Sequence, residues 1–493
     1  MPDSIRRAFA PETFRRQGQQ VVELMADYLA RALGGGSMPV LPDHEPDTLV
    51  EQWPDQFPAV GAAEPVEALR GLLQKVIAQS NHLHHPRYMG HQVTAPLPQA
   101  ALSELAGTLL NNVMAVYEMG PAATAMERSL LRWMGGQLGF DPARCDGVLT
   151  SGGSLGNLTA LLAARQDRSG WDAWTEGQAA GPPLAILAGR SAHYSMQRAV
   201  QIMGWGREGL LSVPVDERFR LRPEALPEAL TAAQARGRRV IAVAASACST
   251  ATGSFDPLEP IGEFCRRHAL WLHVDAAHGA PACLSTRYRH LLAGIDQADS
   301  VVWDAHKMLL MPGILTAVIF RQGSPSYHTF QQQASYLFAP PGPDEQWYNV
   351  SMRTVECTKR MMSLHLYAAL TVQGTQMFAD YVTAAFDLGR RFGELLSQEP
   401  DFELPVPPDC NIVCFRYRPA QGPLAAAELD ALQAEIRQRL LAAGDFYLVQ
   451  TQLPAGLHLR VTLINPFTSE ADLLALLAAV RAAGREVLKS FAL

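Results

Sequence analysis

Several features are missing from this sequence of 493 residues, and each absence excludes a class of protein. No apolar run reaches about 20 residues, the length that a helix needs to cross a bilayer, so we expect no membrane span. The N-terminus lacks the basic stretch followed by an apolar stretch that marks a secretory signal. The formal net charge of -7 argues against a surface for nucleic acid or anionic lipid. We therefore expect a cytoplasmic protein whose partners are small molecules.

Recognisable metal and dinucleotide motifs are also missing. The seven cysteines are scattered along the chain, and even the closest pair, Cys410 and Cys414, belongs to no repeated metal-type spacing. We interpret them as reduced cysteines that mostly fill the core. Three histidines lie between His84 and His91, but no cysteine or carboxylate set accompanies them, so a metal site is not expected there. The G-x-G-x-x-G spacing of dinucleotide-binding proteins is absent.

What is present is the ordinary composition of a large globular enzyme, with 48% hydrophobic and 18% charged residues. Residues 147–165, 183–189, 239–247 and 257–267 alternate between strand-like and helix-like patterns. This alternation continues to Lys307 and predicts an α/β fold with a mainly parallel sheet. We predict three segments: a helical arm over residues 1–80, a large domain over residues 81–375 and a small α+β domain over residues 376–493.

The stretch Asp299–Phe320 (DSVVWDAHKMLLMPGILTAVIF) interrupts two apolar runs with a lysine, Lys307. Burying an ammonium group without a partner is costly. Two interpretations remain open for Lys307 taken alone. Its side chain extends to the surface at a strand end, or it is held in a pocket as an imine-forming amine.

A second apolar run, which begins at Trp271, ends in a carboxylate, Asp275. A buried carboxylate needs a cation or hydrogen-bond donors. Asp275 and Lys307 could form an ordinary salt bridge with each other. They could instead meet the two ends of one cofactor, the aspartate on a pyridinium nitrogen and the lysine on an aldehyde carbon.

Together, VDAAHG (274–279) and WDAHKML (303–309) resemble the group II amino-acid decarboxylases that depend on pyridoxal 5'-phosphate (PLP). This family includes the glutamate, cysteine-sulfinate and aromatic amino-acid decarboxylases. The resemblance implies the aspartate-aminotransferase fold, with Lys307 and His306 at the cofactor. It also implies that Asp275 meets the ring nitrogen and that Ala277 packs on one ring face.

The turn TSGGSLGN (150–157) runs from a short strand into a helix with leucines on one face. Free amides at a helix N-terminus favour phosphate, and glycines allow close approach, so Gly153 and Ser154 are candidate phosphate ligands. A plain turn with Ser154 as helix cap is the alternative. The resemblance favours the phosphate role. It also assigns Thr250 to the cofactor, beside the Asp275 region.

Two further residues gain catalytic roles from the resemblance. The segment SAHYS (191–195) matches the family motif whose histidine stacks on the pyridine ring, which indicates His193. The segment ASYLF (334–338) resembles a catalytic loop whose tyrosine returns a proton to the product, which indicates Tyr336. Taken alone, His193 could be a cap or core residue, and Tyr336 a surface aromatic.

Candidate substrate ligands lie near the two ends of the chain. An inward arginine in the strand-like LHLRVTLI (457–464) needs an anion, and its fork fits a carboxylate, so Arg460 is the candidate for the substrate α-carboxylate. A salt bridge to a glutamate is the alternative. By resemblance, His91 and Gln92 line the substrate side, although glutamate decarboxylases carry glutamine at the position of His91.

Three more expectations concern structure. Where many relatives carry Asn-Pro, this chain has Asp304-Ala305, and we leave Asp304 out of the site because a carboxylate would repel the phosphate. We expect one helix over Arg353–Leu370. A helix over Pro11–Ala32 has an apolar face and a proline-rich exit, and the resemblance implies that it helps to form a homodimer with an active site at the subunit interface.

These features predict decarboxylation of an L-amino acid to its amine and CO2, with an acidic substrate such as aspartate, glutamate or cysteine sulfinate. The alternatives are an aromatic amino-acid decarboxylase, an aldehyde synthase that couples decarboxylation to oxidative deamination, and a cofactor-binding protein without turnover. Relatives with aldehyde-forming activity replace the loop tyrosine by phenylalanine or the stacking histidine by asparagine, so Tyr336 and His193 argue against that activity.

Overall fold

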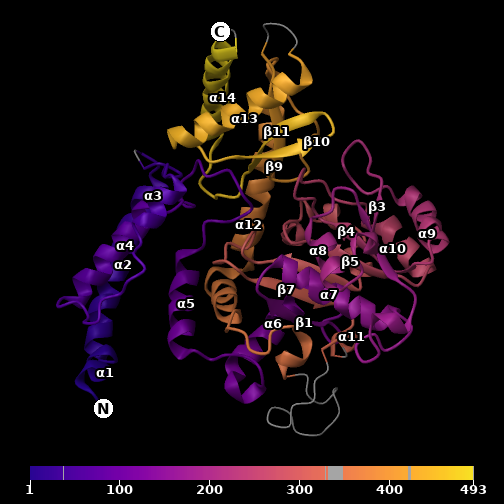
Figure 1. Ribbon diagram of the computed structural model, residues 1–493, viewed down its shortest axis with the longest axis horizontal. Coiled ribbons are helices and arrows are strands. Elements are labelled where there is room, and N and C mark those ends of the chain that lie inside the picture. The colour runs from indigo at the N-terminus through magenta and orange to yellow at the C-terminus, as the bar shows by residue number, and fades with distance from the viewer. Residues whose placement is uncertain (37, 328, 331–347, 420–423, 492–493) are drawn as a thin grey trace. The chain divides into compact units, whose positions relative to one another are not determined.

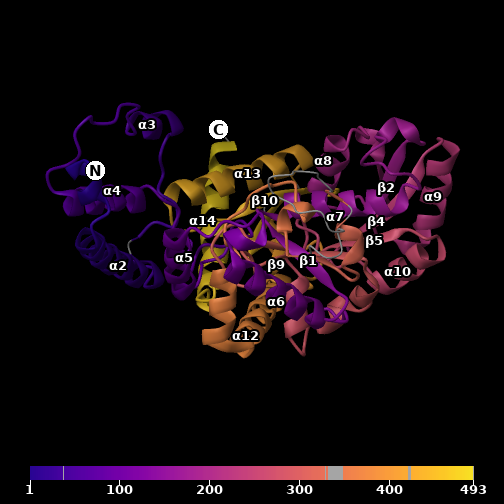
Figure 2. The ribbon, with the colours of Figure 1, turned by 90° about the horizontal axis from the view of Figure 1, so that it is seen from below.

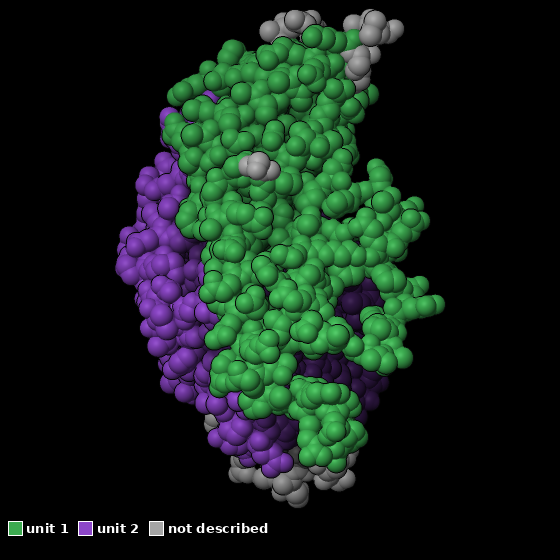
Figure 3. Space-filling model, turned by 90° about the vertical axis from the view of Figure 1, so that its left-hand side faces the viewer, with its two compact units in different colours: residues 1–91, 396–403, 415–493 green, residues 92–395, 404–414 purple. Residues whose placement is uncertain are grey.

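The computed structural model describes residues 1–36, 38–327, 329–330, 348–419 and 424–491. The chain forms two compact units (Figure 1, Figure 3). Unit 1 contains residues 1–91, 396–403 and 415–493, and unit 2 contains residues 92–395 and 404–414. The three segments expected from the sequence stay a prediction.

A seven-stranded sheet forms the centre of unit 2. In spatial order its strands are β1 (Asp146–Thr150), β7 (Thr316–Phe320), β6 (Ser300–Asp304), β5 (Trp271–Asp275), β4 (Arg239–Ser246), β2 (Leu184–Gly189) and β3 (Leu210–Val213). The strands from β3 to β6 are parallel, whereas β7 is antiparallel to both of its neighbours. The predicted α/β fold with a mainly parallel sheet is confirmed.

The sheet strands are apolar runs because both faces of the sheet are covered. All residues of β1, β2, β5, β6 and β7 are buried. Helices α7 (Gly153–Arg168) and α8 (Ser195–Ile202) pack on one face and share a hydrophobic cluster with the strands. Figure 2 shows α10 (Leu258–Arg267) on the other side of β4 and β5. The remaining helices of the large unit include α5 (Pro98–Leu110), α6 (Pro121–Gln137), α9 (Leu226–Ala235) and α11 (Ser324–Tyr327).

The carboxyl ends of β4, β5 and β6 lie at one edge of this sheet because the three strands are parallel neighbours. Asp275 is the last residue of β5, Thr250 follows the end of β4, and Lys307 follows the end of β6. Ligands of open α/β sheets bind at such an edge. The fold therefore gathers the predicted cofactor residues of unit 2 on one edge.

The expected helix over Arg353–Leu370 is wrong in its first half. The chain forms a short 3-10 turn at Val350–Arg353, and α12 begins only at Ser363 and continues to Gln398. The intervening segment bonds to other parts of unit 2, since Lys359 bridges to Met114 through its backbone. Arg353 and Lys359 are also buried in ion pairs with Asp146 and Glu127, which tie both ends of this irregular segment to the rest of unit 2.

Unit 1 combines the N-terminal helices with the C-terminal part of the chain. A four-stranded sheet has the order β10-β11-β9-β8, with β10 antiparallel to β11 and β8 antiparallel to β9, and α13 packs on α14 and β11. The elements are α1 (Asp3–Ala8), α2 (Pro11–Leu33), α3 (Pro46–Glu51), α4 (Pro65–Ala78), β8 (Phe402–Glu403), α13 (Ala426–Ala443), β10 (Val449–Leu453), β11 (Gly456–Thr462) and α14 (Glu470–Phe491). Strand β9 (Ile412–Tyr417) begins in unit 2 and ends in unit 1.

Helix α2 forms as predicted but buries little of its apolar face. Ala32 is its one buried residue, and Phe14, Val22 and Met25 are each more than 40% exposed. None of the described helices is long and apolar enough to cross a membrane. Exposed apolar side chains at helical spacing are typical of a surface that meets another protein.

Candidate active site

Lys307 and Asp275 lie at the ends of adjacent parallel strands. β5 and β6 pair in register from His273–Ser300 to Asp275–Val302. The Asp275 residue is 8% exposed and the Lys307 side chain is 16% exposed. Burial lowers the pKa of Lys307, but the charges of Asp304 and then Asp275 raise it by more, so the amine of this chain is held as an ammonium ion. Lys307 is therefore a charged lysine inside the sheet edge, not a surface side chain.

Asp304, which the sequence reasoning left out of the site, lies directly beside Lys307. Lys307 Nζ lies 2.9 Å from Asp304 Oδ2, and the Asp304 side chain is 2% exposed. The sequence reasoning considered only repulsion between this carboxylate and a phosphate. It missed the ammonium group three residues later, which compensates the buried charge.

The Asp304 carboxylate is held from several sides. The Thr316 hydroxyl on β7 donates a hydrogen bond to Oδ1, and His306 Nε2 lies 3.6 Å from Oδ2. Burial raises the pKa of Asp304, but the Lys307 charge leads the effects that bring it below its ordinary value. A Cβ atom on Gly153 would lie 3.2 Å from Oδ2, so the carboxylate also lies against the first residue of α7.

Asn157 on α7 was missed by the sequence reasoning, although it orders the site. Its Nδ2 donates to Asp275 Oδ2 (3.0 Å) and to Ser195 Oγ (2.9 Å), and its Oδ1 lies 3.0 Å from His273 Nε2. His273 Nδ1 lies in turn 2.9 Å from Ser300 Oγ. One buried amide thus fixes the orientation of Asp275.

His193 lies in the loop between β2 and α8, where Ser195 orients it. The Ser195 backbone N–H donates to His193 Nδ1 at 3.3 Å, and Ser195 Oγ lies 2.8 Å from the same nitrogen. Because Nδ1 accepts, the neutral ring carries its proton on Nε2. Burial lowers the pKa of His193, and the Lys307 charge adds to this effect, which favours the neutral form. Ser195 also accepts from Asn157, so His193 and Asp275 share one hydrogen-bond network.

The predicted phosphate turn forms the start of α7. Gly152 has φ +106°, a conformation that favours glycine, and the helix begins at Gly153 without a side-chain cap on its first turn. The first amides of an α-helix have no partner within the helix, so those of Gly153 and Ser154 can meet an anion. The Asp304 carboxylate lies beside the Cα side of Gly153, the first residue of this helix.

The other predicted cofactor residues of unit 2 lie along the same edge. The backbone N–H of Ala277 donates to Asp275 Oδ1 at 3.3 Å, and its carbonyl accepts from the Asp304 backbone N–H at 3.1 Å. Nδ1 of His306 lies 2.9 Å from the Leu315 carbonyl oxygen. Thr250 is partly buried in the loop after β4. Ala277 thus links the ends of β5 and β6.

Two of the predicted substrate residues belong to unit 1. Arg460 on β11 is 7% exposed, whereas His91 is exposed and its ring lies 5.9 Å from that of Tyr447. Burial lowers the pKa of His91, and the charges of Arg460 and then Arg437 lower it further. Within unit 1 the two guanidinium groups therefore act on one imidazole. Gln92, the third predicted residue, is buried in unit 2.

Tyr336 lies outside the described residues, so its predicted role stays a prediction.

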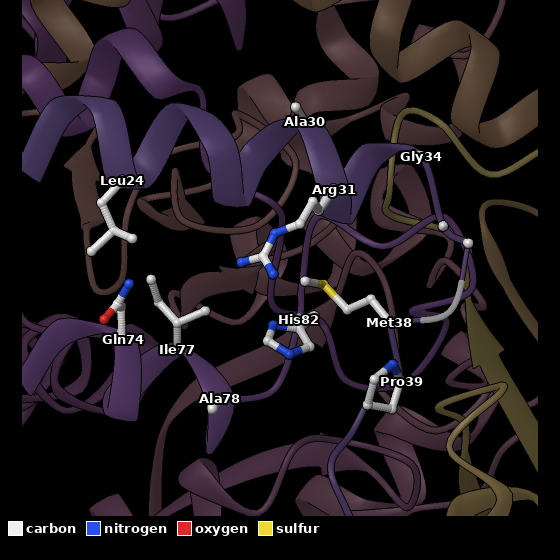
Figure 4. Close-up of a pocket in the computed structure, with 12 residues that line it drawn as sticks. Leu24, Ala30, Arg31, Gly34, Met38, Pro39, Gln74, Ile77, Ala78 and His82 are labelled. Carbon is white, nitrogen blue, oxygen red and sulfur yellow. The ribbon is translucent and has the colours of Figure 1, made fainter. Parts of the chain in front are cut away.

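A cavity of about 760 Å³ lies in unit 1, and Figure 4 shows Arg31, Met38 and His82 among its lining residues. It contains none of the predicted cofactor or substrate residues. Its size alone therefore does not mark it as the site of the chemistry.

Comparison with known proteins identifies the family of this chain. The pyridoxal-dependent decarboxylase conserved domain matches residues 46–418 of the chain. The protein belongs to the pyridoxal-dependent decarboxylase family. It is therefore a PLP-dependent amino-acid decarboxylase, a carboxy-lyase, as the sequence motifs predicted.

Members of this family from several organisms resemble the chain over most of its length. Cysteine sulfinic acid decarboxylase of Rattus norvegicus is 32% identical over 424 residues, which are 84% of this chain and 85% of that protein. L-aspartate decarboxylase of Metarhizium robertsii is 31% identical over 366 residues, 74% of this chain and 72% of that protein. The crystal structure of mouse CSAD matches with a TM-score of 0.89 at 28% identity and covers 96% of this chain and 99% of that chain.

The residues of this decarboxylase fit the PLP cofactor of its family. Lys307 offers the amine, Asp275 the acid for a ring nitrogen, and the uncapped start of α7 offers amides for a phosphate. The sequence reasoning missed Asn157, Ser195, His273 and Asp304. For Asp304 a signal existed, since an apolar strand-like run ends at this carboxylate, as another ends at Asp275, and Lys307 follows it by three residues. For the other three, only the folded geometry shows their role.

Proposed function

We propose that this decarboxylase removes the α-carboxylate of an acidic L-amino acid, such as aspartate, glutamate or cysteine sulfinate, and releases the amine and CO2. The observation that carries the choice of substrate class is the similarity over most of the chain to a cysteine sulfinic acid decarboxylase and an L-aspartate decarboxylase, and the positive charges of Arg460 and Arg437, which lower the pKa of His91, are in keeping with it. An acidic amino acid has two carboxylates, and arginine is suited to each of them.

In this proposal, each residue of unit 2 has a separate task. When bound, PLP supplies an aldehyde that condenses with an amine and a ring that accepts the electron pair of the broken bond. Lys307 provides the amine that holds the cofactor. Asp275, oriented by Asn157, keeps a proton at the ring nitrogen. His193, with its proton on Nε2, packs against the ring and orients the bond that breaks.

Gly153, Ser154, Thr250, Ala277 and His306 complete the cofactor site in this proposal. The amides of Gly153 and Ser154 hold the phosphate at the start of α7. Ala277 packs on the ring from the end of β5. Thr250, in the loop after β4, lies on the Asp275 side of the site. His306, in the loop after β6, lies next to Lys307.

We assign the substrate end to Arg460, His91 and Gln92. Arg460 binds the α-carboxylate that departs, and Arg437 with His91 favours a second anionic group. We also assign Tyr336 the return of a proton to Cα, on the strength of the ASYLF segment. A phenylalanine at position 336 would divert the reaction toward an aldehyde, so Tyr336→Phe should raise the ratio of aldehyde to amine.

The same proposal includes a homodimer in the cytoplasm, with the active site at the subunit interface. The exposed apolar residues of α2 supply a surface for a second copy of the chain. Light scattering should report twice the chain mass. Removal of residues 1–33 should yield the mass of one chain.

A panel assay tests the proposed function. Carbon dioxide release is measured with aspartate, glutamate, cysteine sulfinate, tyrosine and tryptophan, with and without PLP. We expect PLP-dependent turnover of one or more of the acidic substrates. Turnover of only tyrosine or tryptophan would show that the protein is an aromatic amino-acid decarboxylase. Cofactor binding without turnover of any substrate would overturn the proposal.

A further inference from the structure

The site contains a carboxylate whose position is unexpected for a cofactor with a phosphate group. Asp304 faces Lys307 with Oδ2 at 2.9 Å and is fixed at Oδ1 by the Thr316 hydroxyl. Both side chains are largely buried, at 2% and 16% exposure. An ion pair in such surroundings is much stronger than one in water.

This ion pair concerns the atom of Lys307 that must react. Condensation with an aldehyde needs the neutral amine, because its lone pair forms the new carbon–nitrogen bond while the aldehyde oxygen leaves as water. An ammonium ion must first give up a proton to a base. Whatever stabilises the ammonium ion therefore opposes the attachment of the cofactor.

The other groups that face Lys307 do not replace Asp304. Asp275 also favours the ammonium form, from the end of β5, and Cys248 acts in the same direction from the loop after β4. Two other titratable groups interact with Asp304. They are the imidazoles of His306 and His193. Among the described residues, Asp304 is the one carboxylate that lies within ion-pair distance of Lys307 Nζ, at 2.9 Å.

We propose that Asp304 is a positioning residue that holds Lys307 as an ammonium ion in the cofactor-free chain and thereby controls how readily the amine captures an aldehyde. The inference rests on the proposed role of Lys307. In the capture step, the Lys307 ammonium gives one proton to solvent, the nitrogen forms its bond to the aldehyde carbon, and the oxygen takes up one proton from solvent and one from nitrogen as it leaves as water, so that the product is a protonated imine.

The carboxylate could act on the phosphate instead, because it lies against Gly153 at the start of α7. Two aldehydes separate these effects. Pyridoxal carries the same aldehyde as PLP but no phosphate, so a change in its capture reports on the amine alone. A change confined to PLP would report on the phosphate.

The test uses the full chain freed of PLP, as wild type, D304N and the control D299N. Asparagine keeps the shape of Asp304 and still accepts from Thr316. Asp299 is a partly buried carboxylate directly before β6, paired with Arg321 at 2.8 Å, and its replacement removes the same charge outside the site. The rate of imine formation with pyridoxal and with PLP is followed by absorbance from mildly acidic to alkaline pH, and circular dichroism checks the fold.

For the wild type, we expect the rate to rise about tenfold per pH unit through the neutral range, since the fraction of neutral amine does so below its pKa. D304N should capture pyridoxal at least about tenfold faster at neutral pH and reach its plateau at lower pH, because one pKa unit is a factor of ten in neutral amine. D299N should follow the wild type.

Two results would overturn the inference. One is a wild-type rate with pyridoxal that stays constant through neutral pH, which needs no variant. The other is a D304N profile equal to the wild type with pyridoxal, whether or not capture of PLP changes. Lys307→Ala serves as a separate control, since imine formation that survives it would overturn the role of Lys307 and not that of Asp304 alone.

Discussion

The Asn157 side-chain amide donates a 3.0 Å hydrogen bond to Asp275 Oδ2, from α7 to the end of β5. The same NH2 group donates to Ser195, which orients His193. The proposed contacts of Asp275 and His193 to the cofactor ring therefore depend on one buried amide. Residues that hold a reacting group in place commonly matter nearly as much as the group itself.

Asn157→Leu should lower kcat by about ten- to a hundredfold, because loss of supporting hydrogen bonds has effects of this size. Asn157→Asp should have a different signature. A second carboxylate beside Asp275 raises the pKa of the pair, so the acidic limb of the kcat profile should move to higher pH. Steady-state kinetics over a pH series measures both. An unchanged profile in Asn157→Asp would contradict the proposed coupling.

His273 predicts an acid-sensitive fold. Burial lowers the pKa of this histidine to about 4. Below about pH 6.5 the unfolded chain gains a proton on the imidazole and the folded chain does not, so stability falls as the pH falls toward 4. Between about pH 7.5 and about pH 5 this one residue should cost about 2 kcal/mol.

Urea unfolding of the wild type and His273→Gln at these two pH values checks this expectation. Glutamine keeps an amide near Asn157 and Ser300 but has no titrating group. The loss of stability on acidification should be smaller in the variant by about 2 kcal/mol. Equal losses in the two proteins would show that His273 is not the source.

Lys359 and Glu127 form a buried ion pair that we expect to stabilise unit 2. Both side chains are at most 2% exposed, and Lys359 Nζ also donates to the Leu149 carbonyl at 2.8 Å. Lys359→Met leaves Glu127 charged and unpaired, which should cost about 3–5 kcal/mol of unfolding free energy. Replacing both residues by apolar ones should cost much less, because no charge is then buried alone. A double-mutant cycle by urea unfolding measures the coupling, and additive effects of the two single changes would contradict it.

Arg460 and Arg437 should differ in the substrates that they affect. Arg460→Met removes the proposed contact to the α-carboxylate and should lower kcat/KM for every substrate by about ten- to a hundredfold, as expected for hydrogen bonds to a charged group. Arg437→Met should lower kcat/KM for acidic substrates selectively. Arg439→Met is the matched control, because Arg439 lies on the same helix and pairs with Glu435 and Glu486 at the surface. Equal effects of Arg437→Met and Arg439→Met would contradict a role in specificity.

The sequence predicted the sheet edge because each strand there is an apolar run that ends in a chemically distinctive residue. Asp275 and Lys307 are examples, and the strand-to-helix turn at Gly153 is another. The parallel order of the strands then places these ends together, as the structure confirms. These apolar runs and the residues that end them were therefore sufficient to predict the fold and the family.

Other parts of the site depend on contacts between distant residues. Asn157 has the pattern of an ordinary helix residue, and only packing of α7 on β5 brings it to Asp275. For Asp304, the prediction considered only repulsion between its carboxylate and a phosphate. The energy of the buried carboxylate in the folded chain depends on Lys307, Thr316 and His306 together. The helix expected from Arg353 failed for the same reason, since long-range ion pairs override local helical propensity there.

The attachment point of the cofactor tests the central claim most directly. The chain has four lysines, Lys75, Lys307, Lys359 and Lys489, so reduction of the PLP-loaded protein with borohydride followed by peptide mass mapping gives an unambiguous answer. We predict one pyridoxyl-phosphate group per chain on the peptide that contains Lys307, and none in Lys307→Ala. A label on another lysine, or no label with retained PLP-dependent turnover, would contradict the account.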